Sequence, residues 1–465
     1  MRELPMLAAA PLRLRVEGLR VSLWAVAVGG LMLIGLALRL FWVFYTDTIP
    51  LGGDPHWYYV VGINLAKGFG FVADRNELWE IPGPAEPTAF WPPGYPFALG
   101  ALFKLFGVSI TAAQVLNAVL GMLTVPLVFA LGARLFSRGV GLAAAGMFAL
   151  FPNVIVGTPL LFPEPLFTLI FVGALLLLVS FPADGRWWPL VCFGFLIGLA
   201  TLTRGQGLVL VPVAAVYWLM TAGWLTAARA TALALLTAVA VIAPWTVRNA
   251  VEMDAFIPVS TNSAAALRVG HNEDSTGTTK WTDDQIDGFY MWQSLYHPDW
   301  EVQGYREYTR LAIDYALSHP GDEVVLSGRK VYQLYRSDVD VIPWLETLGA
   351  TPLKPDGLDG VLWRLLDTGY YTTVFAAVAS VPLWLRRDPK QWLLVSLVLF
   401  WTLFHVAFLG EPRYHQPLYP IFFMSLAAGV WVAGTALVRA VERLRARRAE
   451  AATTTTMAVE DAPAS

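Results

Sequence analysis

Residues 22–45 read SLWAVAVGGLMLIGLALRLFWVFY, and GGDPHWYYV follows at 52–60. The first stretch is long enough to cross a bilayer, which takes about 20 apolar residues in a helix. Asp54 then lies where the chain leaves the membrane, and a carboxylate at that level can reach both a lipid headgroup and a substrate in water. A purely structural interpretation is that Asp54 caps the following helix, because Asp is a favoured N-cap residue. Position alone leaves both interpretations open.

The composition is that of a membrane protein. The chain has 465 residues, of which 56% are hydrophobic and 14% charged, whereas a soluble domain carries about 25% charged residues. The 32 Lys and Arg residues nearly balance the 35 Asp and Glu residues, so we expect no nucleic acid as a partner. The single cysteine, Cys192, excludes an intrachain disulfide and a cysteine metal cluster. We therefore expect a polytopic α-helical membrane protein.

Ten spans are predicted along the chain at about 20 residues each. Basic residues such as Arg134, Arg186 and Arg229 fall in the short connections on the same side as the N-terminus. By the positive-inside rule this side is the cytoplasm, so both termini are predicted to be cytoplasmic in the cell membrane. The predicted spans lie near 22–45, 110–134, 139–158, 163–181, 189–203, 207–222, 230–248, 367–385, 391–409 and 417–438.

The spans divide the chain into five predicted parts. These are a cytoplasmic N-terminus (1–21), a transmembrane core that contains the first outer loop (22–249, with the loop at 46–109), an outer soluble segment (250–366), C-terminal transmembrane helices (367–438) and a cytoplasmic disordered tail (439–465).

Helices are also predicted outside the spans. In the first outer loop we expect surface helices at 55–67 and 94–106, which are too short to cross the bilayer. In the outer segment Thr282 and Gln285 form a capping box that predicts a helix to about 296. Further helices are expected at 302–318 and 321–336.

Several ionisable residues are predicted near the outer membrane face, where charge is costly and commonly faces a cavity or a partner. Arginine presents a planar fork of donors to phosphate, so the set indicates a site for an anionic lipid headgroup. The residues are Arg39, Asp54, His56, Glu164, Arg204, Arg248, Arg413 and His415.

Structural alternatives stay open for most of this set. Arg39 can extend to the outer headgroups, and Glu164 and Arg248 suit the charge of helix ends. Arg413 can be an ordinary loop cation. The histidines have no helical metal-ligand spacing and are expected to be polar interface residues. The sequence contains no P-loop, dinucleotide fingerprint or nucleophile elbow.

Six motifs, in order, resemble those of the bacterial GT-C glycosyltransferases of the family 39, protein-mannosyltransferase-like kind, which include the aminoarabinose transferases that modify lipid A. The resemblance covers about residues 30–430. It implies a GT-C-type helix bundle with interfacial helices in the first outer loop and a small outer domain. The motifs are GGDPHWYYVVGINLAKGFGF from Gly52, FWPPGYPFALGALFKLFG from Phe90, LLFPEPLFTLIF from Leu160, TLTRGQGLVLVP from Thr201, PWTVRNAVEMDAFIPVSTNSAAALRVGHNEDSTG from Pro244 and EPRYHQPLYPIF from Glu411.

The resemblance implies a membrane glycosyltransferase that moves a sugar, with inversion, from a polyprenyl-phosphate donor to an acceptor hydroxyl outside the cytoplasmic membrane. The acceptor is expected to be a glycan, a lipid or a protein. Asp54 is expected to be the general base and Glu164 a second catalytic acid. The implied donor-phosphate residues are Arg204, Arg248 and Arg413, and the implied cavity residues are His56, Tyr58, Tyr95, Tyr414 and His271.

The chain departs from the family pattern at three places. Where relatives often read Gly-Asn-Asn, it has Gly270, His271 and Asn272. Pro55 and His56 stand where many relatives carry a second acid, so no metal or other cofactor is firmly implied. Pro163 replaces the serine before Glu164. The alternative function is a lipid or glycan transporter or flippase without transferase chemistry. Transporters usually contain two matching halves with broken helices at mid-membrane, and the sequence shows no such repeat.

Overall fold

The computed structural model describes residues 13–16, 19–46, 53–73, 86–279, 298–338, 342–343, 345, 358–386 and 388–460. Of residues 13–21, 358–359 and 448–460 it describes the backbone alone.

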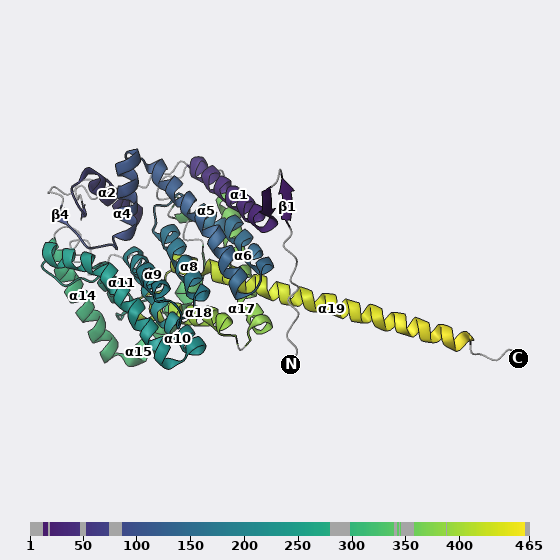
Figure 1. The fold of residues 1–465 in the computed structure, drawn as a ribbon. Coiled ribbons are helices and arrows are strands. Elements are labelled where there is room, and N and C mark those ends of the chain that lie inside the picture. The colour runs from purple at the N-terminus through teal and green to yellow at the C-terminus, as the bar shows by residue number, and fades with distance from the viewer. Residues whose placement is uncertain are drawn as a thin grey trace.

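Apolar helices form the body of the molecule (Figure 1). In the described part of the chain, six helical stretches are long and apolar enough to cross a membrane, and four further apolar helices are shorter. Each predicted span coincides with one helix or with two consecutive ones, so the multi-pass helical class is confirmed and the count of ten spans stays a prediction. The helices are α1 (Leu23–Thr46), α5 (Ile110–Leu135), α6 (Arg138–Leu150), α7 (Pro152–Val156), α8 (Glu164–Ser180), α9 (Trp188–Thr203), η1 (Gly205–Val209), α10 (Leu210–Ala222), α11 (Trp224–Glu252), α17 (Leu358–Trp384), α18 (Pro389–Ala407), η3 (Pro412–Leu418) and α19 (Tyr419–Glu460).

Close packing between neighbouring helices holds the bundle together. α5 packs against α6 and α8, α9 packs against α11, and α17 packs against α19. Aromatic rings fill the centre: Phe171 contacts Phe167 and Trp401 with ring centroids 5.4 Å apart in each pair. Lipid tails are as apolar as these side chains, so van der Waals packing rather than exclusion from water keeps the helices together.

Two groups of shorter elements lie outside the bundle. In the loop that the sequence predicts to lie outside, and that we continue to call the first outer loop, α2 (Gly53–Lys67) packs against α4 (Gly94–Phe106), and β3 (Val72–Ala73) pairs with β4 (Glu86–Pro87). The approach of α2 to α4 is close, because a Cβ at Gly62 would lie 2.9 Å from Leu99 Cβ. The outer segment contains α12 (Asn262–Gly270), α14 (Pro298–Ser318) and α15 (Pro320–Tyr335).

These elements test the helices predicted outside the spans. The two predicted surface helices are present as α2 and α4, and those predicted at 302–318 and 321–336 are present as α14 and α15. The helix predicted from Thr282 lies outside the described residues.

The chain ends differ from the sequence expectation. A short antiparallel hairpin of β1 (Arg13–Val16) and β2 (Leu19–Ser22) precedes α1. At the other end α19 runs to Glu460 and projects from the bundle as a single helix (Figure 1). It thereby includes most of the tail that the sequence predicted to be disordered. Each residue added to an existing helix costs far less than nucleation does, and the Ala- and Arg-rich stretch after Val438 favours helix.

Candidate active site

An ion pair joins Asp54 to Arg413. Asp54 lies in the first turn of α2, and Arg413 lies in η3 between α18 and α19. Arg413 Nη2 donates to Asp54 Oδ2 over 2.8 Å. Both side chains are mostly buried but keep some access to solvent, at 19% exposure for Asp54 and 17% for Arg413. The carboxylate that the sequence placed at the membrane exit therefore faces an arginine from the last outer connection.

A second ion pair joins Glu164 to Arg204. Glu164 begins α8 and Arg204 ends α9, and the Arg204 guanidinium donates to Glu164 Oε1. Both side chains are largely buried. The other carboxylate oxygen, Glu164 Oε2, is buried and has no hydrogen-bond partner among the described residues. One of the two Glu164 carboxylate oxygens is therefore hydrogen-bonded, and the other is available to water or substrate.

Tyr414 brings the two ion pairs together. The Arg204 guanidinium lies 4.9 Å from the centre of its ring, and that of Arg413 lies 5.5 Å away. Arg413 also lies 4.8 Å from the ring centre of Phe162. Such contacts are favourable because the ring face carries negative charge. Two acids and two arginines thus form a compact, neutral cluster, which we call the charged quartet: Asp54, Glu164, Arg204 and Arg413.

Tyr58 is buried beside the quartet. Burial raises the pKa of its hydroxyl well above the ordinary value, and the negative charge of Asp54 raises it further. Its ring meets the edge of Tyr95 at 5.5 Å, and the Tyr95 hydroxyl donates to Asn117 Oδ1 over 3.0 Å. Tyr58 therefore stays a neutral hydrogen-bonding group, and Tyr95 supports it from behind.

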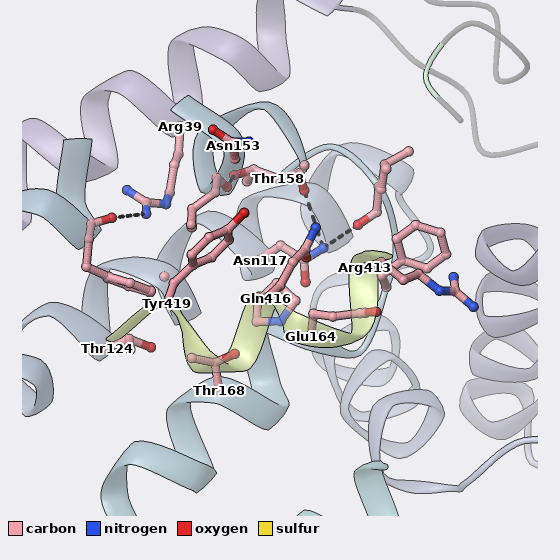
Figure 2. Close-up of a pocket in the computed structure, with 17 residues that line it drawn as sticks. Arg39, Asn117, Thr124, Asn153, Thr158, Glu164, Thr168, Arg413, Gln416 and Tyr419 are labelled. Atoms are coloured by element: carbon pink, nitrogen blue, oxygen red, sulfur yellow. Dashed lines mark hydrogen bonds between the residues drawn. The ribbon is translucent and has the colours of Figure 1, made fainter. Parts of the chain in front are cut away.

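A small cavity of about 70 Å³ lies behind Glu164. In Figure 2 Arg39 lies toward one end of it and Glu164 toward the other, with Tyr419 and Gln416 between them. Asn153 Oδ1 is buried here without a hydrogen-bond partner among the described residues, as Glu164 Oε2 is. A cavity of this volume admits water, which would satisfy both oxygens.

Arg39 is a buried arginine of this cavity and does not extend to the headgroups. It is 1% exposed, and it donates to the carbonyl oxygens of Gly35, Ala149 and Phe148 over 3.0, 3.0 and 3.2 Å. Two of these carbonyls belong to the last turn of α6, which explains the placement: the carbonyls of a final turn have no partner within their own helix.

A larger cavity of about 240 Å³ opens on the other side of Arg204. Tyr58, Tyr414 and Arg204 line it, as do Ser260, Asn262 and Ser263 of the outer segment. An apolar groove of about 850 Å³ runs between α4, α8, α9 and α11. Thr203 lines both the groove and the cavity. The two spaces therefore share Thr203 as part of their walls, directly beside Arg204.

Arg248 lies apart from the quartet. It donates to the carbonyl oxygens of Thr88 and Phe71, each over 2.7 Å, and its guanidinium lies 5.0 Å from the ring centre of Trp245. Arg248 thus joins α11 to the backbone of the first outer loop at the outer end of the apolar groove. The sequence analysis grouped Arg248 with Arg204 and Arg413 as donor-phosphate residues. In the structure its guanidinium donates to backbone carbonyl oxygens.

His271 also lies in a separate cluster. Its Nδ1 is 2.9 Å from Glu323 Oε1, and its Nε2 is 3.0 Å from Lys330 Nζ. Lys330 Nζ also donates to the carbonyl of Val406 over 3.0 Å. This cluster lies where α15 meets the end of α18. Of the other predicted cavity residues, Tyr58 and Tyr414 line the larger cavity, Tyr95 lies behind Tyr58, and the half-buried His56 lies close to Asp54 on α2.

The connection that carries Arg413 is fixed by the outer segment. Gly410 N donates to the carbonyl of Gly277 over 2.8 Å. Glu411 Oε1 accepts from the Thr278 hydroxyl over 2.8 Å and from Thr279 N over 2.7 Å. Glycine is required on this path, because a Cβ at Gly410 would overlap the carbonyl of Lys330. Arg413 is therefore held two residues from a rigid junction.

Sequence reasoning missed several residues of the site. Asn117 donates to the carbonyl of Leu160 over 2.8 Å and so holds the loop that precedes Glu164. Gln416 lines the small cavity and Phe162 lies under Arg413. For Asn117 a signal existed, since an amide in a predicted span is unusual. For the metal question, no group of three His, Cys, Asp or Glu residues suited to a metal ion occurs in the described ranges.

Residues 91–247 match the model of the family described as dolichyl-phosphate-mannose-protein mannosyltransferase. A search of curated proteins found no significant match. Among solved structures the chain is similar to the archaeal oligosaccharyltransferase AglB from Archaeoglobus fulgidus in complex with an inhibitory peptide and a dolichol-phosphate. The TM-score is 0.55 and the identity 16%, over 90% of this chain and 52% of AglB.

The apo form of the same Archaeoglobus fulgidus enzyme matches with a TM-score of 0.52 and 16% identity, over 91% of this chain and 52% of that one. ArnT from Cupriavidus metallidurans bound to undecaprenyl phosphate matches with a TM-score of 0.43 and 16% identity, over 89% of this chain and 78% of that one. The chain thus spans about half the length of the oligosaccharyltransferase. The family model covers part of the chain, and the solved structures, at 16% identity, show a shared fold. The predicted multi-pass helical fold and its resemblance to GT-C glycosyltransferases are thereby confirmed.

Proposed function

We propose that the protein transfers a sugar from a polyprenyl-phosphate donor to an acceptor hydroxyl at the outer face of the cytoplasmic membrane, with inversion. The observation that carries the proposal is the charged quartet, in which two acids from the first outer loop and α8 face two arginines. The proposed orientation, with both termini in the cytoplasm, follows from the basic connections. The dolichol-phosphate bound to AglB supports a lipid-phosphate donor.

The geometry suggests how the donor binds. The apolar groove suits a polyprenyl chain, and it shares Thr203 with the wall of the larger cavity. A phosphate bound beside Thr203 would lie next to Arg204, and the Arg413 guanidinium contacts the same Tyr414 ring. Arginine forks match phosphate oxygens. Each arginine already has a carboxylate partner, so an arriving phosphate competes with Asp54 and Glu164 for the same donors.

This competition links donor binding to catalysis. When phosphate takes the Arg413 donors, the Asp54 carboxylate loses its partner and is free to accept the proton of the acceptor hydroxyl as general base. The acceptor oxygen forms a bond to the anomeric carbon while the bond from that carbon to the phosphate oxygen breaks. The leaving phosphate takes the electron pair, and the two guanidinium groups stabilise its growing charge. Attack opposite the leaving group gives inversion.

Glu164 has a different part in this mechanism. It fixes the Arg204 guanidinium through one oxygen, and its second oxygen faces the small cavity. We propose that Glu164 orients Arg204 toward the phosphate and holds water in the cavity behind the site. Asp54 keeps the proposed role of general base, because its carboxylate is the one that the first outer loop brings to the quartet.

The test uses the purified full-length protein in lipid nanodiscs with radiolabelled undecaprenyl phosphate as the probe. We expect binding by the wild type and roughly tenfold weaker binding by Arg204→Lys and Arg413→Lys, since lysine lacks the fork. Arg134→Lys, at an exposed position of the second connection, is the matched control and should bind as the wild type does. Equal binding by the wild type and all three variants would contradict the proposed phosphate site.

A second assay separates the transferase from the flippase alternative. Undecaprenyl-phosphate sugars are incubated with the protein and with membrane extract as a source of acceptors. A transferase consumes the sugar lipid and depends on Asp54. A flippase moves the lipid between leaflets without consuming it, and Asp54→Asn would leave that movement intact.

A further inference from the structure

The larger cavity beside Arg204 has the chemistry of a sugar site. Its walls carry the aromatic rings of Tyr58, Trp91, Tyr305 and Tyr414. They also carry hydroxyl and amide groups from the start of α12, namely Ser260, Asn262 and Ser263. A sugar ring presents C–H groups that pack on aromatic faces and hydroxyls that need donors and acceptors at fixed positions. We propose that this cavity binds the sugar of the donor lipid and that Asn262 and Ser263 determine which sugar is accepted.

The position of the cavity indicates that it holds the sugar of the donor and not its lipid chain. This inference rests on the proposed function, which puts the donor phosphate at Arg204. The sugar is attached directly to that phosphate, so it must occupy space next to Arg204. The groove on one side of Thr203 is apolar and suits the chain. The cavity on the other side is the one that offers hydroxyl and amide groups.

Asn262 is available for a ligand. Its backbone N–H donates to the carbonyl of Phe90 over 3.1 Å, which fixes the main chain. Its side-chain amide makes no hydrogen bond to the described part of the chain, and the side chain is half-buried at the cavity wall. The Ser263 hydroxyl donates to the carbonyl of Ser260 over 2.9 Å and keeps its oxygen as an acceptor. An amide and a hydroxyl side by side can read a pair of sugar hydroxyls.

A buried carboxylate holds this wall in place. Glu301 of α14 accepts from the Thr261 hydroxyl over 2.7 Å, from the Thr88 hydroxyl over 2.8 Å and from Ala89 N over 2.9 Å. The two chain segments that reach the cavity, near Trp91 and at Asn262, are thus joined through one side chain. The Thr261 N–H also donates to the carbonyl of Ala89 over 2.9 Å. Such preorganisation is what selective recognition of hydroxyls requires, because a loose wall would fit many sugars.

The experiment compares affinities for a bare and a sugar-bearing lipid. Full-length protein in nanodiscs is titrated with undecaprenyl phosphate and with its mannosyl, glucosyl and galactosyl derivatives. We expect the wild type to bind at least one sugar lipid about tenfold more tightly than the bare lipid. Asn262→Ala and Ser263→Ala should each reduce this gap about three- to tenfold, the range of one hydrogen bond, while binding of the bare lipid stays unchanged. Asn272→Ala is the control outside the cavity and should keep the full gap; Asn272 lies two residues beyond the end of α12, and its amide donates to the carbonyls of Arg268 and Val269.

The outcomes separate this inference from the proposed function. A gap that survives in both Asn262→Ala and Ser263→Ala overturns the sugar site, and so does a wild type that binds every lipid equally well. In those cases the phosphate site stands if Arg204→Lys still weakens binding of undecaprenyl phosphate. A wild type that binds neither the bare lipid nor any sugar lipid overturns the proposed function itself.

Discussion

Arg413 donates a 2.8 Å hydrogen bond to Asp54, although the two residues are 359 positions apart in the chain. The contact brings the first outer loop and the last outer connection to one point. It also pairs the candidate base with a guanidinium, and such an ion pair holds a carboxylate away from other partners. The first two predictions follow from the two ion pairs of the charged quartet.

Replacing Asp54 with Asn should lower transfer about 10²–10⁴-fold, the usual contribution of a general base. Binding of undecaprenyl phosphate should be kept or become tighter, because Arg413 loses its competing carboxylate. The measurement is turnover of sugar lipid beside a titration with the bare lipid. If Asp54 is an N-cap alone, Asn serves equally well and the mutant transfers at the wild-type rate.

Replacing Glu164 with Gln should lower turnover at least tenfold without loss of folded protein. The charge that orients Arg204 disappears, while the size of the side chain stays the same. Size-exclusion chromatography and turnover are measured together, with Glu442→Gln on the exposed part of α19 as the control. A residue that merely suits a helix start would cost well under about 1 kcal/mol and leave activity unchanged.

Arg204 and Arg248 should respond differently to lysine. Arg204→Lys should weaken binding of undecaprenyl phosphate, because the fork toward phosphate is lost. Arg248→Lys should instead lower the thermal midpoint, since one ammonium group replaces two donors to the carbonyls of Thr88 and Phe71. If Arg248→Lys lowers the affinity for the lipid at an unchanged thermal midpoint, this result supports the phosphate-binding role that the sequence analysis predicted for Arg248.

Lys330 should make stability depend on pH. Burial lowers the pKa of its ammonium group to about 8, against 10.5 in an exposed lysine. Between these values the unfolded chain binds more protons than the folded one, so the free energy of unfolding rises with pH across this window. Lys330→Met should remove this rise. Thermal midpoints of wild type and mutant at pH 7, 8, 9 and 10 give the result, with the exposed Lys104→Met as the control. A constant difference between wild type and Lys330→Met at all four values contradicts the prediction.

The orientation is tested by labelling from outside the cell in a Cys192→Ser background. A cysteine at Ser318, exposed between α14 and α15, should react with an impermeant maleimide. A cysteine at Arg447, exposed on α19, should react after the membrane is opened and not before. The opposite pattern would invert the topology and move the proposed site to the cytoplasm.

The sequence predicted the parts of the fold that depend on local pattern. Apolar length gave the spans, and charge bias gave an orientation. The members of the quartet could also be predicted from the sequence, because all four are ionisable residues at the ends of spans, where charge is costly. They are Asp54, Glu164, Arg204 and Arg413. What the sequence could not give was their pairing. Which acid meets which arginine depends on how α2, α8, α9 and η3 pack, and no local pattern encodes that.

Arg39, Arg248 and His271 show the same limit. Each is a polar residue that the sequence placed in or near the predicted site, and each contacts backbone carbonyls or a separate cluster rather than the quartet. A carbonyl acceptor leaves no trace in the sequence, since every residue carries one. The same holds for α19, whose course beyond the bundle follows from helix propagation and not from a recognisable motif.

The overlap that a Cβ at Gly410 would cause with Lys330, and the one that a Cβ at Gly270 would cause with Phe408, bear on how such enzymes can be recombined. Two backbones touch there without any side chain between them, so the shapes of both partners are set together. An outer segment taken from a relative would bring its own backbone to this contact and would displace the connection that carries Arg413. Chimeras designed to exchange acceptor or sugar preference should therefore transplant residues 262–338 together with 408–418 as one unit.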